Sequence, residues 1–559
     1  MKNFKFFIKK YGSAALLCGM VLFINSCTKD FDEINTNKNA LANLADSQIP
    51  FLFSAAEANG TNSGWAYQVA QNLFHDQYAQ YFANTTTYFP SDRLVIRMDW
   101  IGSLWSPLYT TVMPQLQTIF EKTDPASAQY ALANIFWVIS FQRVTDTWGP
   151  IPYFSAGQVA KSVPYDPQDL IYDDFFKRLA SAVAVLKGKT SETPFGSFDL
   201  IYGGNVNKWI KFANTLRLRL AMRISKVNPT RAKTESEAAV ADGVMTTSPD
   251  DDALIQKSVV NGDVNGLSVM DWGEFRMSSA MSSVLNGYED PRLPVYFNPT
   301  LESWQANEVA NGKPKTLDGS NFVATDLAHP LKYHGLRNGL KPDDMAKPLN
   351  TADANSRHGE RWNSAGASVT FLGKTYPGGQ AVPSNVMAAA EAYFLRAEGV
   401  LLGWNMGGGT AKDYYEAGIR ESMKQWGITD AAAISAYISS TKTPIPPGDA
   451  QNSPALSTVP VQFGATPAVQ LEQILLQKWL ALYPDGNEAW ADVRRAGKIK
   501  LYPVVYSDNP DLPNPSSQTI RRINFMTSEI QTNGSEVTKA VNLLGGADKI
   551  TTPLWWDKN

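Results

Sequence analysis

The chain has 559 residues, of which 44% are hydrophobic and 18% charged, a composition that excludes disordered and fibrous proteins. Its 50 Lys and Arg residues nearly balance 53 Asp and Glu residues, so nucleic acid is not an expected partner, because phosphate neutralisation needs clustered positive charge. Fifteen Trp, 22 Tyr and 26 Phe residues supply a large core and leave rings for ligand-binding surfaces.

The first 26 residues have the pattern of a secretory signal. Four lysines fall within the first ten residues, and an apolar stretch over 11–24 follows them. This stretch is too short to span a bilayer stably, and a small residue precedes the predicted cut. We therefore predict that residues 1–26 are a lipoprotein signal peptide that the mature protein lacks.

The segment Ile24–Cys27 resembles a bacterial lipobox, in which the cysteine is acylated and the signal is cut just before it. The alternative is an ordinary signal peptide that happens to contain a cysteine, although Cys27 has no other evident use. More than one acyl chain on a residue gives stable anchoring. We therefore predict attachment to the membrane through Cys27 and a flexible tether over 27–45, and no later stretch reaches 18 consecutive apolar residues that could span a bilayer.

A charged segment over 29–33 follows the cysteine. It resembles the acidic tether that sends lipoproteins to the cell surface in Bacteroidetes, and a solvated charged linker explains it equally well. The resemblance implies a location in the outer membrane, with the protein facing the cell exterior.

Helical periodicity predicts helices in two regions, before about residue 243 and after residue 384. Pro114 should kink the helix around 108–119 or place its start later. The apolar residues that carry the pattern are, in chain order, Phe74, Tyr78 and Tyr81; Leu108, Val112, Leu116 and Ile119; Leu132, Ile135, Phe136 and Ile139; Phe175, Leu179, Ala182, Val183 and Leu186; Trp209, Phe212, Ala213, Leu216 and Leu220; Ala390, Phe394, Ala397 and Leu401; Tyr415, Ile419, Met423 and Trp426; and Leu471, Ile474, Leu475, Trp479 and Leu482.

Between about residue 243 and residue 383 the helical pattern fails, and Gly, Asn, Asp, Ser and Pro dominate. Such segments run over the surface and carry function. The predicted fold class is therefore mainly α, with a tetratricopeptide-like scaffold of helical pairs and a loop-rich cap. We expect one domain over 46–559 with an irregular insertion at about 243–383. No clean 34-residue repeat is found, so the number of helix pairs stays open.

The residue sets of common catalytic sites are missing from the sequence. Four histidines are present without a His-Glu-x-x-His pair, and neither a Gly-x-Ser-x-Gly elbow nor a complete phosphate-binding loop occurs. The run Asp250–Asp252 could ligate calcium, but it lacks the alternating spacing of a calcium loop, and a solvated acidic turn is favoured. We expect no enzyme activity, no cofactor and no metal.

Several stretches resemble, in this order, motifs of the SusD/RagB family of Bacteroidetes outer-membrane lipoproteins, in its SusD-like branch. Together with the lipobox they cover nearly the whole mature chain. They are Asp146–Tyr153, Asn207–Arg219, Asp290–Pro294, Tyr393–Glu398, Asn487–Arg495, and the closing Ile520–Ile523 with Glu529.

The resemblance implies a helical scaffold that sits as a lid on a TonB-dependent outer-membrane transporter of SusC type. It also implies capture of an oligosaccharide or, in some members, a peptide as nutrient. A surface glycoside hydrolase and a structural surface lipoprotein without any ligand are the two alternatives.

The resemblance places the ligand site in the loop after the first helix and in the irregular middle insertion. A sugar site needs flat exposed rings beside side chains that can form hydrogen bonds. Each loop ring could instead pin its loop to the scaffold. The candidate ligand-binding residues are Tyr88, Phe89 and Arg93 in the first loop, Trp100 near that loop, and Trp272, Trp304 and Trp362 in the insertion.

Overall fold

The computed structural model describes residues 45–61, 66–158, 160–258, 272–316, 327–362 and 368–559. The chain divides into two units, Met1–Ile49 and Pro50–Asn559. The predicted signal peptide, Cys27 and all of the tether except its last residue lie outside the described residues.

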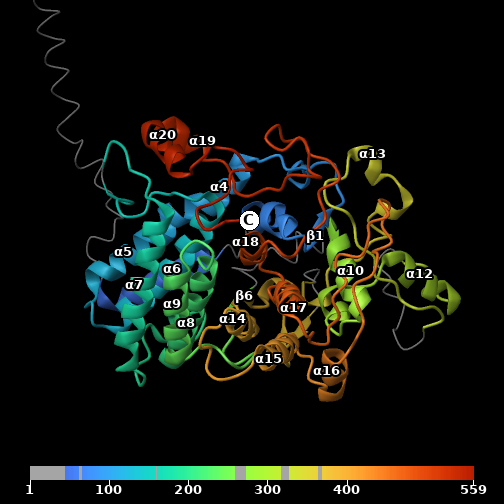
Figure 1. Ribbon diagram of the computed structural model, residues 1–559, viewed down its shortest axis with the longest axis horizontal. Helices are drawn as coiled ribbons and strands as arrows, with labels where there is room; N and C mark the ends of the chain where they lie inside the picture. Colours follow the sequence, from blue (N-terminus) through green and yellow to red (C-terminus); the bar gives the residue numbers. More distant parts are fainter. Residues whose placement is uncertain (1–44, 62–65, 159, 259–271, 317–326, 363–367) are drawn as a thin grey trace, which may run out of the picture. The chain divides into compact units, whose positions relative to one another are not determined.

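The described part of the chain is mainly helical, as predicted (Figure 1). Pro114 does not begin a separate helix, because the π-helical turn Leu108–Val112 joins α4 directly to α5, and Pro114 lies just after that change of hydrogen-bond register. The α-helices are α3 (Ile49–Gly60), α4 (Met98–Pro107), α5 (Met113–Lys122), α6 (Ala128–Trp148), α7 (Gln168–Lys187), α8 (Val206–Arg223), α9 (Pro229–Asp242), α10 (Ser279–Tyr288), α11 (Leu293–Tyr296), α12 (Leu301–Ala310), α13 (Pro342–Met345), α14 (Ala389–Leu401), α15 (Ala411–Lys424), α16 (Ala431–Ile438), α17 (Pro467–Ala481), α18 (Gly486–Ala496), α19 (Thr527–Thr532) and α20 (Gly534–Leu543).

Helices that follow one another in the chain pack as pairs. In one group α6 packs on α7, α7 on α8, and α8 on α9, and in a second group α14 packs on α15 and both contact α17 (Figure 1). Side chains of Ser127, Asn205 and Asp485 accept hydrogen bonds from free backbone N–H groups at the first turns of α6, α8 and α18. These caps fix where the scaffold helices begin.

Charged side chains from four helices meet in the interior where the two groups join. Arg219 Nη2 lies 2.5 Å from Glu391 Oε2, and Arg223 Nη2 lies 2.6 Å from Glu488 Oε2. Arg223 Nε is 3.5 Å from Asp146 Oδ2, and all these side chains are at most 4% exposed. Because a buried charge is costly without a partner, the pairs hold α6, α8, α14 and α18 in one arrangement.

Three of these five residues, Asp146, Arg219 and Glu488, belong to the stretches that resemble family motifs. Glu391 lies two residues before one such stretch, and Arg223 lies four residues after another. In a second buried set Arg495 Nη1 is 2.6 Å from Glu398 Oε1 and Lys478 Nζ is 2.8 Å from Asp492 Oδ1, and all of these residues except Lys478 belong to such stretches. The motif stretches therefore specify the scaffold.

Within the described ranges the strands are short and pair in three two-stranded sheets. They are β1 (Phe82–Asn84) with β3 (Phe275–Met277), β2 (Ala253–Ile255) with β6 (Ser384–Met387), and β4 (Val369–Phe371) with β5 (Lys374–Tyr376), all antiparallel. The segment over 243–383 is not wholly irregular, since it also holds α10 to α13. The β1–β3 pair joins the loop after the first helices to this middle segment.

The sequence favoured a solvated acidic turn for Asp250–Asp252. This prediction is wrong, because Asp251 and Asp252 are buried. Asp251 lies 2.7 Å from Lys211 on α8, and Asp252 accepts a hydrogen bond from Ala389 N at the start of α14. Among the described residues no group of His, Cys, Asp and Glu side chains is placed to hold a metal ion. No helix in the described ranges is long and apolar enough to cross a membrane.

Candidate ligand-binding surface

The β1–β3 pairing brings the first loop beside the residues around Trp272. Asn84 is the register partner of Phe275, and Thr85 N donates to Glu274 O at 2.8 Å. Thr85 Oγ1 donates to Gly273 O at 3.1 Å, so the backbone next to Trp272 is held against the first loop. The Trp272 side chain is 53% exposed.

Three rings form one aromatic surface: Tyr88 and Phe89 from the first loop and Trp100 from the first turn of α4. Phe89 is buried and stacks on Phe275 of β3, with ring centroids 5.8 Å apart and an interplanar angle of 10°. Trp100 lies edge-on to Phe89 at 5.8 Å, and Tyr88 lies 5.1 Å from Phe89. Tyr88 is 72% exposed and Trp100 is half-buried. Phe89 therefore supports two rings that remain accessible.

An ion pair steadies the Trp100 ring. The Arg97 guanidinium lies 4.6 Å from the centroid of that ring, and its Nη2 is 2.8 Å from Asp99 Oδ2. Hydrogen bonds from Arg97 lower the pKa of Asp99 below its ordinary value, and the same bonds raise the pKa of Arg97. Both side chains are exposed and offer donors and acceptors beside the aromatic surface.

Arg93 is buried and its Nε donates to Asp508 Oδ2 at 2.6 Å. Asp508 N in turn donates to Arg93 O at 2.9 Å. These contacts tie the first loop to the segment that follows α18, so Arg93 acts in the structure as a link between loops and does not present its guanidinium at the surface.

Trp362 is also buried, with 3% of its surface exposed. It packs against Trp426, and Arg361 lies over both rings, 4.7 and 4.6 Å from their centroids. Arg361 is also 4.0 Å from the ring centroid of Phe371 in β4. Trp362 therefore pins the β4–β5 hairpin to the end of α15.

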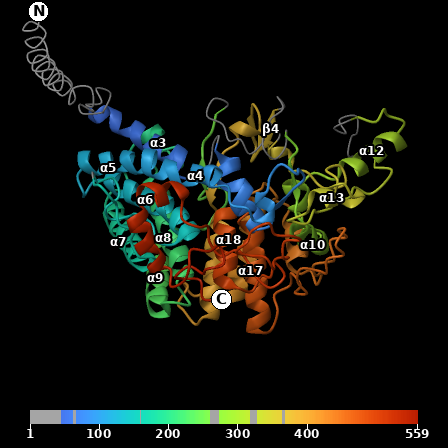
Figure 2. The same cartoon turned by 90° about the horizontal axis from the view of Figure 1, so that it is seen from above.

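Trp304 lies on α12 and is half-buried. In Figures 1 and 2, α12 and α4 lie well apart in both views. The structure thus brings together Tyr88, Phe89 and Trp100 and holds the chain next to Trp272 beside them, while Trp304 and Trp362 lie elsewhere.

Sequence reasoning missed Phe275, Arg97 and Asp99. Phe275 gave no signal, because its role depends on a pairing with a strand almost 200 positions earlier in the chain. The Arg-x-Asp-Trp spacing around Trp100 could have indicated a ring flanked by a local ion pair, but such a short pattern is common.

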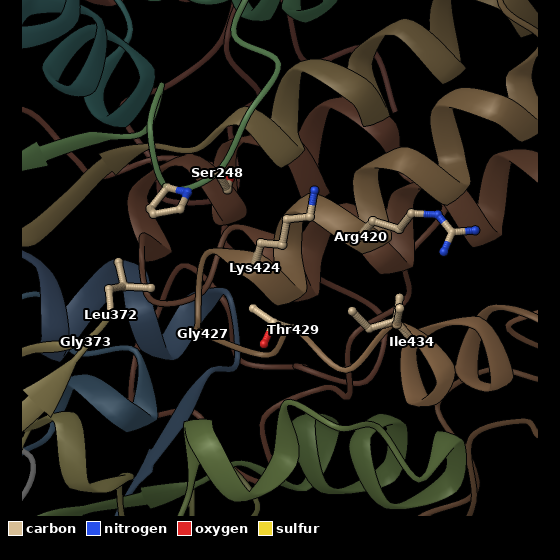
Figure 3. Close-up of a pocket in the computed structure, with 10 residues that line it drawn as sticks. Ser248, Leu372, Gly373, Arg420, Lys424, Gly427, Thr429 and Ile434 are labelled. Atoms are coloured by element: carbon tan, nitrogen blue, oxygen red, sulfur yellow. The ribbon is translucent and has the colours of Figure 1, made fainter.

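A separate hollow of about 510 Å³ lies between the β4–β5 turn and helices α15 and α16 (Figure 3). Arg420 and Lys424 lie on one side of it and Thr429 and Ile434 on the other, with Leu372 at its edge. Both cations are held by acids of their own helix, at 3.5 and 2.7 Å. None of the residues predicted from sequence lines this hollow.

Comparisons with known proteins identify relatives over almost the full length of the chain. Residues 25–557 match the family described as SusD-like, the Susd and RagB outer membrane lipoproteins. No curated protein matches at a significant level.

Solved structures of SusD homologs are also similar to this chain over more than nine-tenths of its length. A chitin-binding SusD homolog from Flavobacterium johnsoniae is 34% identical, with 91% of this chain and 98% of that chain covered and a TM-score of 0.76. A SusD homolog from Bacteroides vulgatus is 30% identical, with 92% and 98% covered and a TM-score of 0.75. The structure of a further protein, described as chitin-binding, is 25% identical, with 91% of this chain and 100% of that chain covered and a TM-score of 0.71.

Proposed function

Because the chain belongs to the SusD/RagB family of outer-membrane lipoproteins, we propose that it captures an oligosaccharide at the cell surface and delivers it to a TonB-dependent transporter of SusC type. Family membership makes it a non-catalytic binding protein of the outer membrane. The glycan, the outward orientation and the transporter belong to the proposal.

The observation that carries the proposal is the aromatic surface. Sugar rings have apolar faces that stack on flat aromatic rings, and their hydroxyls need donors and acceptors nearby. Tyr88 and Trp100 offer two accessible rings on the buried support of Phe89, and Arg97 and Asp99 lie beside them. The two charged side chains beside the rings, Arg97 and Asp99, pair with each other, so this surface does not require a charged ligand.

The ligand contacts in this proposal are Tyr88 and Trp100, with Trp272 joining from the middle segment. Phe89, Arg93 and Trp362 support their loops and act on binding only through loop position. Trp304 would contact ligand only at a second, separate place. Chitin-derived oligosaccharides are the first ligands to test, because two of the similar structures are of proteins described as chitin-binding.

The anchor in this proposal is acylated Cys27, with residues 1–26 removed. An anchor on the same membrane as the transporter raises the local concentration of the two partners, so a modest interface suffices. Affinity purification from mildly solubilised outer membrane should recover a large barrel protein in about equal amount, and release of the protein by Cys27→Ala would locate the anchor.

The experiment that tests the proposed function is incubation of the purified protein with chitohexaose and with a mixed peptide library, followed by chromatography of bound and free material. The expected result is retention of intact chitohexaose and no retained peptide. Preferential retention of peptides, or no retention of either, would contradict the glycan proposal.

A further inference from the structure

Two hollows of about 560 and 450 Å³ adjoin along α4 and share Ser106 and Ser528 in their linings. One wall consists of Gly102, Ser103 and Ser106, and the opposite wall consists of Thr527, Ser528 and Gln531. Helices α4 and α19, which carry these walls, are labelled in Figure 1. We call this joined hollow the α4–α19 groove.

The groove presents hydroxyl groups that the fold does not use. In the described part of the chain, the side-chain hydroxyls of Ser103, Ser106 and Ser528 make no intramolecular hydrogen bond. In contrast, the hydroxyls of Thr110 and Thr532, which line the second hollow, donate to backbone carbonyls at 2.9 and 2.8 Å. The serines thus remain available to a ligand that carries many hydroxyls of its own.

The acidic side chains that border the groove are engaged by their neighbours. Asp99 pairs with Arg97, and Glu529 accepts hydrogen bonds from Tyr165 Oη at 3.1 Å and Asn533 Nδ2 at 3.3 Å. Lys161 borders the second hollow and adds one positive charge. This lining suits an uncharged polar ligand better than a strongly charged one.

The groove starts next to the aromatic surface. Asp99 lines the first hollow and also binds Arg97, the residue that covers the Trp100 ring. The second hollow contains Trp105 and Tyr109, whose ring centroids are 5.0 Å apart, and Tyr109 is half-buried. At a helical rise of 1.5 Å, Asp99 and Ser106, which lie seven positions apart on one face of α4 and both line the first hollow, are roughly 10 Å apart along the helix axis, which is long enough for about two sugar residues.

We infer that the α4–α19 groove is an extension subsite, which binds further residues of a neutral saccharide chain whose first residues stack on Tyr88 and Trp100. This inference rests on the proposed function and adds to it that the ligand is an extended chain. Its consequence is an affinity that rises with chain length, because only longer chains reach the unpaired serines.

The test is calorimetric titration with chitobiose, chitotetraose and chitohexaose. Ser106→Trp fills the groove at an exposed position of α4, and a triple change to Ala at Ser103, Ser106 and Ser528 removes the hydroxyls without adding bulk. Ser181→Trp, at an exposed position of α7 that lines neither hollow, is the matched control.

The parent and Ser181→Trp should bind chitohexaose more tightly than chitobiose. Each groove variant should lose roughly tenfold in affinity for chitohexaose and almost nothing for chitobiose. If the groove variants keep the length dependence of the parent, or if the parent shows none, the groove is not a subsite while the proposed function stands. If the parent binds no oligosaccharide of any length, the proposed function fails, and this inference fails with it.

Discussion

At the scale of the residue, exposure separates the tryptophans that the sequence singled out. Trp272 has 53% of its surface exposed, whereas Trp362 has 3% and packs beneath Arg361 against Trp426. Both lie in a Gly- and Asn-rich segment with no helical stripe to bury a ring. Local sequence therefore predicted the same exposure for both rings, and only contact with Trp426, two residues beyond the end of α15, distinguishes Trp362 from Trp272.

A matched pair of substitutions tests this distinction. Trp362→Ala should lower the free energy of unfolding by about 3–5 kcal/mol, because it leaves a cavity beneath the β4–β5 hairpin. Trp272→Ala should change it by less than about 0.5 kcal/mol, as expected for an exposed site. Denaturant titration of both variants measures the two values. Equal destabilisation by the two changes would show that the burial of Trp362 is not what holds the hairpin.

Asp252 should make stability depend on pH. Burial raises its pKa from 3.8 to about 7, while Ala389 N and Ser248 Oγ donate to it. Between about pH 4 and pH 7 the folded protein therefore binds more protons at this carboxyl than the unfolded chain, so this carboxyl lowers stability progressively as pH rises. Asp252→Asn removes the titration but keeps an acceptor oxygen.

The measurement is the free energy of unfolding of parent and Asp252→Asn from pH 4 to pH 7.5. The parent should become progressively less stable relative to the variant as the pH rises. A constant difference over that range would mean that the carboxyl keeps its ordinary pKa in the folded protein.

At the scale of the element, the buried ion pairs explain why the scaffold helices that resemble family motifs carry charged residues. The opposite face of the helix around Trp209 carries Arg219 and Arg223, and the structure buries both against acids from α6, α14 and α18. A motif rich in charge and Trp can be taken for a ligand site. Here the charges meet one another inside the scaffold.

Removing one partner of this network should be costly. Glu488→Gln leaves the Arg223 guanidinium buried without its 2.6 Å counter-charge, and the expected loss of stability is roughly 3–5 kcal/mol. Glu416→Gln breaks a partly exposed pair with Arg420 at 3.5 Å and should cost less than about 1 kcal/mol. Thermal or denaturant unfolding compares them, and similar losses would contradict a structural role for the buried network.

Helical periodicity predicted the scaffold because the apolar residues of its helices recur at helical spacing and pack against helices nearby in the chain, although α6 and α8 are buried on nearly all sides. The middle segment was less predictable, since α10 to α13 are short and their apolar residues face partners from distant segments. The candidate site shows the same limit. Tyr88, Trp100 and Trp272 could be proposed from residue type and loop position, but the support from Phe89 stacked on Phe275 depends on the β1–β3 pairing.

At the scale of the whole molecule, the β1–β3 pair connects the helical scaffold to the aromatic surface. A helical scaffold held by buried ion pairs carries a loop and a middle segment that β1 and β3 join, and the accessible rings lie where those segments meet. The family supplies the outer-membrane location and the absence of catalysis. In the proposed function, ligand binding depends on the aromatic surface.

The most direct test of that claim is calorimetric titration of chitohexaose into the parent, a Tyr88→Ala/Trp100→Ala double variant and Phe51→Ala. Phe51 is a matched exposed ring, 56% accessible, that lies against Phe198 outside the aromatic surface. Losing two central anchors should cost roughly 2–4 kcal/mol, or about 30-fold or more in affinity, while Phe51→Ala binds like the parent. If the folded double variant binds chitohexaose as tightly as the parent does, the aromatic surface is not the ligand site.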